Sequence, residues 1–100
     1  MATKMIKIQV DEDTREVTVS PTGVYVNPRD TLQWEVLQAD SFVLTFDDAR
    51  ICEHGHEIVG RNHQAQITVG DRRGIFHYQV AMSVKDKVYV LSGCPSVHNG

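Results

Sequence analysis

The sequence lacks both a long apolar run and a helical repeat of apolar residues. No stretch approaches the roughly 20 apolar residues that a membrane-spanning helix needs. No segment keeps apolar residues at helical spacing for more than about two turns. A membrane partner and a helical bundle are therefore excluded, although 41% hydrophobic and 23% charged residues are ordinary values for a globular protein.

Clustered positive charge is also absent. Ten Lys and Arg residues face thirteen Asp and Glu residues, so the formal net charge is −3. Binding to nucleic acid depends on grouped cations that neutralise phosphates, and we therefore expect no nucleic-acid partner. Two cysteines are too few to form a disulfide framework.

The first ten residues, "MATKMIKIQV", contain neither an apolar signal core nor a cleavage site. As written, the chain is expected in the cytoplasm, and it would be periplasmic if a signal peptide had been removed. One hundred residues suffice for one hydrophobic core. We expect residues 1–100 to form a single domain and a monomer.

Apolar residues alternate with polar ones along most of the chain, which is typical of half-buried strands. The alternating segments are residues 6–10, 17–19, 24–26, 32–36, 42–46, 67–69, 76–84 and 88–90. Turn sequences such as "NPRD" and "GDRRG" separate them. The pattern predicts an all-β, antiparallel Greek-key β-sandwich or barrel of seven to eight strands. An immunoglobulin-like sandwich is the alternative.

The alternation also predicts which side chains form the core. These are Trp34, Phe42, Leu44, Phe46, Phe76, Tyr78, Val80 and Val88. Two segments fall outside the pattern. Residues 47–64 show no period and are expected to form a long irregular loop, the type of segment that often carries function. Residues 95–100 are expected to form a flexible tail.

Three segments resemble the cupredoxin family in order and spacing, over residues 20–91. "VYVNPRDTLQWEV" resembles the entry into the second sheet, and "SFVLTF" resembles the strand that follows. "ITVGDRRGIFHYQV" resembles the strand pair that leads to the copper cysteine. Small bacterial cupredoxin-like domains without copper are more similar than plastocyanin or azurin. The resemblance implies a cupredoxin-like Greek-key sandwich.

The resemblance also implies where a blue copper site would lie. Such a site requires two imidazoles and a thiolate, with a weak axial thioether. Asp40 and Ser41 occupy the place of the first histidine, Val80 that of the cysteine and Ser83 that of the second histidine. The loop that carries the remaining ligands is reduced to a turn at residues 85–86. A blue copper centre is therefore not expected.

The hexapeptide "CEHGHE", residues 52–57, concentrates metal-binding side chains within the irregular segment. Cys52, His54 and His56 would point to one side of an extended chain. The strand directions of the resemblance place Cys94 at the same end of the sandwich, which predicts a Cα separation from Cys52 below about 10 Å. Two thiols, a disulfide and a tetrahedral zinc or copper site with these four ligands all remain open.

For function, the sequence favours a non-catalytic binding or interaction domain that has no cofactor. Its partner would be an unidentified protein or small molecule. The alternative is a zinc- or copper-binding protein that uses Cys52, His54, His56 and Cys94. We do not expect an enzyme, because nothing in the sequence suggests an orienting group or an oxyanion hole for a Cys52 nucleophile.

Overall fold

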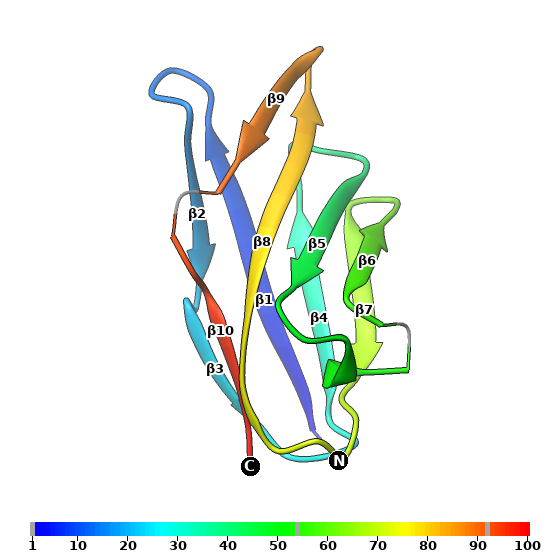
Figure 1. The fold of residues 1–100 in the computed structure, drawn as a ribbon. Coiled ribbons are helices and arrows are strands. Elements are labelled where there is room, and N and C mark those ends of the chain that lie inside the picture. The colour runs from blue at the N-terminus through cyan, green and yellow to red at the C-terminus, as the bar shows by residue number, and fades with distance from the viewer. Residues whose placement is uncertain (1, 54, 92) are drawn as a thin grey trace.

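The computed structural model describes residues 2–53, 55–91 and 93–100 (Figure 1). The strands are β1 (Thr3–Asp11), β2 (Glu16–Ser20), β3 (Gly23–Val26), β4 (Thr31–Val36), β5 (Phe42–Phe46), β6 (Glu57–Gly60), β7 (Gln64–Thr68), β8 (Gly74–Val84), β9 (Lys87–Val90) and β10 (Ser96–Asn99). One short 3₁₀ helix, η1 (Ala49–Ile51), precedes the hexapeptide. Within these ranges, no helix has the length and apolar character needed to cross a bilayer.

The strands form two sheets that pack face to face as a β-sandwich. One sheet has the order β2-β1-β4-β7, and the other has the order β3-β10-β8-β5-β6, with β9 paired to β8. The predicted all-β sandwich is confirmed. Two differences from the prediction concern strand number and direction: the described residues contain ten strands, and β1–β4 and β3–β10 are parallel pairs. Both sheets are therefore mixed.

Aromatic rings occupy the centre of the sandwich. The centroid of Trp34 lies 5.7 Å from that of Tyr78 and 6.1 Å from that of Phe46, with the rings edge to face. The Phe46 and Tyr78 centroids are 5.1 Å apart. Burial raises the pKa of the Tyr78 phenol to about 12, because ionisation in the core would leave a poorly solvated charge. Aromatic pairs in this arrangement add to the stability that burial provides.

Seven of the eight predicted core residues are buried, and the exception is Val88, which is 72% exposed. The two-residue turn at 85–86 has positive φ at both positions, 50° and 65°, as in a tight hairpin. This turn pairs Ser83 with Val88 and Met82 with Tyr89. Since paired residues share a face, Tyr89 is buried with Met82 while Val88 points outward. The prediction for Val88 was wrong by one position of register.

The predicted irregular loop at 47–64 contains a strand. β6 pairs antiparallel with β5, and only the connections before and after it are irregular. Ile58 and Gly60 face the interior, but Gly60 carries no apolar side chain, so the alternation cannot be seen in the sequence. Gly60 lies beneath the ring of Phe42, where an added β-carbon would come within 2.4 Å. A small residue is therefore required at this position.

The predicted flexible tail at 95–100 is also corrected, because residues 96–99 form β10 between β3 and β8. Val97 is fully buried. The side-chain amide of Asn99 donates to the carbonyls of Gly70 and Arg72, at 3.0 and 2.7 Å. Val97 is the only apolar residue in "SVHN", so alternation could not reveal this strand.

Replacing the central indole tests the packing. Because Trp34 is fully buried between Phe46 and Tyr78, Trp34→Ala is expected to lower the free energy of unfolding by about 3–5 kcal/mol in denaturant melts. Val88→Ala is the matched control, since this exposed side chain should change stability by about 0.5 kcal/mol or less. Equal losses for the two variants would contradict the assigned core.

Candidate functional site

The positions that correspond to blue copper ligands lie on the second half of β8 and in the connection from β4 to β5. Figure 1 shows this connection at the end of the sandwich that carries the β8–β9 turn. Val80 is fully buried and pairs with Leu44 in the core. Ser83 is exposed on β8, and the side chain of Asp40 is 79% exposed in the connection from β4 to β5. These positions supply no thiolate and no imidazole, so they do not fit a blue copper ion.

His63 is the imidazole near this end, and its role is structural. Its Nδ1 lies 3.1 Å from the Val36 carbonyl and 3.0 Å from the Ala39 carbonyl, so the Nδ1–H tautomer donates to both. The backbone N–H of His63 also donates to the Asp40 carbonyl. His63 therefore ties the turn after β6 to the connection between β4 and β5.

The hexapeptide lies at the other end of the sandwich, beside the 70–74 loop. Cys52 is buried, and its thiol donates to the Gly55 carbonyl at 3.6 Å. The N–H of Gly70 bonds the carbonyl that precedes Cys52. His56 is exposed, and His54 lies outside the described residues. Among the described residues, no three His, Cys, Asp or Glu side chains are grouped to hold a metal ion.

Cys94 has different surroundings. It is exposed, its sulfur lies 3.9 Å from the amide nitrogen of Gln79, and it borders a cavity of about 280 Å³ beside β2. Cys52 and Cys94, both within the described residues, form no disulfide. Cys52 lies beside Gly55 and Gly70, whereas Cys94 lies beside Gln79 and β2. From Cys94 the chain continues as β10, so Asn99, not Cys94, reaches Gly70.

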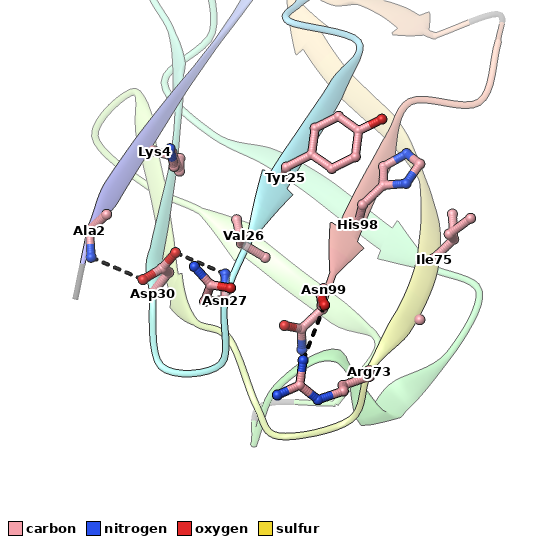
Figure 2. Close-up of a pocket in the computed structure, with 12 residues that line it drawn as sticks. Ala2, Lys4, Tyr25, Val26, Asn27, Asp30, Arg73, Ile75, His98 and Asn99 are labelled. Atoms are coloured by element: carbon pink, nitrogen blue, oxygen red, sulfur yellow. Dashed lines mark hydrogen bonds between the residues drawn. The ribbon is translucent and has the colours of Figure 1, made fainter.

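A cleft that sequence reasoning missed lies at the end of the sandwich near the chain termini (Figures 1 and 2). Its volume is about 710 Å³. The residues that line it are Ala2, Lys4, Tyr25, Val26, Asn27, Asp30, Arg73, Gly74, Ile75, His98, Asn99 and Gly100. β1 contributes one wall, β3 and β10 contribute the other, and the start of β8 closes one side. Four segments that are distant in sequence therefore build one site.

The cleft exists because the chain changes sheets after β2. Pairing between β1 and β2 begins at Lys7 and Ser20. The chain then leaves β1 at Pro21 and continues as β3 in the other sheet. The start of β1 thus has β4 on one side and the cleft on the other.

The floor of the cleft is organised by the carboxylate of Asp30, which is only 4% exposed. The N–H groups of Ala2 and Asn27 each donate to it at 2.9 Å, as the dashed lines in Figure 2 show. These two hydrogen bonds hold the pKa of Asp30 below its ordinary value of 3.8, and attraction to Lys4 contributes less. Asp30 therefore fixes β1 to the turn between β3 and β4.

An aromatic pair forms the rim. The rings of Tyr25 and His98 lie 4.6 Å apart at 30°, and Tyr25 is 73% exposed. His98 is paired across the sheet with Tyr25 on one side and Ile75 on the other. Its Nε2 also lies 3.0 Å from the hydroxyl of Ser96. The result is an exposed apolar platform with a polar tip.

Two cations border the same space. Lys4 is on the face of β1 that points between the sheets, as Ile6 and Ile8 show by their complete burial. Arg73 donates from Nη1 to the carbonyl of Gly100 at 3.2 Å, at the lower edge of the cleft in Figure 2. The cleft thus combines positive charge with an apolar rim.

The chain matches no protein-family model, and no curated protein matches its sequence. Among solved structures, it is similar to a pseudoazurin from Sinorhizobium meliltoi, with a TM-score of 0.54 and 14% sequence identity. The match covers 100% of this chain and 75% of that one. The fold is therefore a cupredoxin-like β-sandwich, as the sequence resemblance predicted.

Acid titration tests the role of Asp30. A carboxyl group with a lowered folded-state pKa contributes stability above its unfolded pKa, here near 3.8, and loses that contribution as pH falls through the folded value. We expect carboxyl-carbon NMR to give a midpoint for Asp30 below 3.8. We also expect Asp30→Asn to weaken the fall in stability between about pH 4 and pH 2.

The matched control is Asp71→Asn, an exposed carboxylate 3.5 Å from Arg29. This variant should retain the wild-type dependence of the denaturation midpoint on acid. If Asp30→Asn and wild type lose stability in parallel as the pH falls, the carboxylate does not fix β1 in the way described.

Proposed function

We propose that this chain is a non-catalytic binding domain that uses a cupredoxin-like sandwich without a blue copper centre and takes its ligand in the cleft between β1 and β3. The observation that carries the proposal is the cleft itself. Its volume of about 710 Å³ is within the usual range of roughly 300–1,000 Å³ for ligand sites. It also combines exposed apolar surface with a few fixed polar groups, as ligand sites do.

The polar groups of the cleft support binding more than catalysis. Both oxygens of Asp30 accept hydrogen bonds from backbone N–H groups, so this carboxylate stabilises the floor of the cleft. The ring of His98 rests on Tyr25 and contacts Ser96 within the same strand. General acid–base catalysis needs groups that are positioned to exchange protons with a reacting atom. The contacts of Asp30 and His98 instead hold these side chains in place within the protein.

Copper addition tests the absence of the blue centre. With Val80 and Ser83 at two of the ligand positions, one equivalent of copper(II) is expected to give no intense blue thiolate charge-transfer band in the visible spectrum. As a control, Cys52→Ser and Cys94→Ser variants should give the same spectrum as wild type. A band that disappears in either variant would show that a thiolate of this chain forms such a centre.

Fragment binding tests the location of the ligand site. In NMR spectra recorded with a library of small aromatic and carboxylic acid fragments, we expect the largest amide shifts at Tyr25, Arg73 and His98. The amides of residues 52–57 should shift least, and Arg73→Gln should weaken the carboxylic acid fragments several-fold. Shifts concentrated at the β8–β9 turn or at residues 52–57 would move the site away from the cleft.

A further inference from the structure

We propose that the ligand of the cleft is an extended peptide segment, which adds as a strand to the open edge of β1 and places an acidic side chain beside Lys4. This inference rests on the proposed function, since it names the class of partner that the same cleft would bind. It follows from the direction of the backbone hydrogen bonds on both walls and from the position of one lysine.

The first wall is the open edge of β1. The N–H of Thr31 donates to the carbonyl of Ala2 at 2.9 Å, so Ala2 faces β4. Backbone groups alternate sides along a strand, and Lys4 and Ile6 therefore face β4 as well. Val10, which has the same parity, bonds the side chain of Gln38 beyond the end of β4.

Thr3 and Met5 consequently direct their N–H and C=O groups to the side that faces the cleft. The β2 ladder reaches down only to Lys7, and the described residues place no strand beside Thr3 and Met5 on that side. A row of open donors and acceptors of this kind is what an added strand pairs with.

The second wall is the edge of β3. The N–H of Ser96 donates to Thr22 and that of Gly100 donates to Val26, so the even-numbered residues of β3 face β10. By alternation, Gly23 and Tyr25 face away from β10, toward the cleft. Asn27 follows the same parity, and its N–H does point across the turn to Asp30. Two strand edges thus border one opening.

The charge of Lys4 favours one kind of peptide in the cleft. The side chain of Lys4 is on the inward face of β1 but is exposed, and an uncharged strand added there would bury the ammonium group without a partner. An inward-pointing charge on an edge strand opposes pairing with a neutral strand. A second copy of this chain that paired through the same edge would bring two such lysines together. A peptide with a carboxylate at the facing position satisfies the ammonium group instead.

Asp30 does not remove this requirement. Attraction to Lys4 is the smallest of the effects that lower its pKa, after the hydrogen bonds from the N–H groups of Ala2 and Asn27. Arg73 lies at the other end of the cleft and adds a second positive charge. An acidic peptide therefore fits the charge of both ends, while Tyr25 and Ile75 offer apolar surface at the rim.

The test is selection of random ten-residue peptides displayed on phage, with the full chain as bait. Enriched peptides should alternate apolar and polar residues and carry Asp or Glu. With the most enriched peptide made synthetically, Met5→Pro should raise the Kd at least about tenfold, because it removes an N–H that faces the cleft. Met5→Ala is the matched control and should leave the Kd nearly unchanged, since it keeps that N–H.

Two further measurements test the proposal even if the Met5→Pro variant does not fold. Bound peptide should slow hydrogen exchange at the amides of Thr3 and Met5 in the wild-type chain. Lys4→Glu should weaken the acidic peptide about tenfold and strengthen a copy in which its acidic residues are replaced by lysine. Protection at another strand edge, or equal binding by Lys4→Glu, would overturn the proposal.

The outcomes separate this inference from the proposed function. Failure to enrich any peptide, together with fragments that bind in the cleft, overturns the peptide ligand and leaves the binding domain. Absence of both peptide and fragment binding at the cleft overturns the two together. Self-association through β1 without peptide binding would identify a second copy as the occupant and would also overturn the peptide proposal.

Discussion

The end of the β1–β2 ladder at Lys7 and Ser20 is the constraint on which much of the molecule depends. β2 pairs with β1 only as far as Ser20, and after Pro21 the chain joins the opposite sheet as β3. This crossing connects the two sheets along one edge. It also leaves the first residues of β1 without a partner on that edge, and Asp30 fixes the loosened end by accepting two N–H groups.

The sequence predicted the fold wherever apolar residues alternate over five or more positions. β8 shows this best, because its inward side chains from Phe76 to Val84 are all apolar and all buried. β6 and β10 were missed because their buried positions include Gly60 and Asn99, which carry no apolar signal. Val88 was predicted on the wrong face of its strand. The backbone geometry of the turn sets the pairing register of β8 and β9, and amino-acid composition reveals that geometry poorly.

The candidate site was predicted less well, for a related reason. Residues 52–57 bring metal-binding side chains together within one short stretch of sequence, whereas the cleft is assembled from four separate segments. A local signal did exist at Lys4, a charged residue at the position where the β1 alternation calls for an apolar one. Residues 95–100 were predicted to form a flexible tail, but residues 96–99 extend the sheet as β10 and bring Asn99 to Gly70.

The two ends of the sandwich differ in how their polar groups are bonded within the protein. At the end of the missing copper ligands, Val80 fills the core and His63 is held by the carbonyls of Val36 and Ala39. Those groups are satisfied within the protein, so that end offers a ligand little. At the opposite end, backbone groups of β1 and β3 remain directed into open space beside an ammonium group. Unsatisfied donors, acceptors and charge are what a ligand can complete, and in this sandwich they gather where β2 leaves its partner.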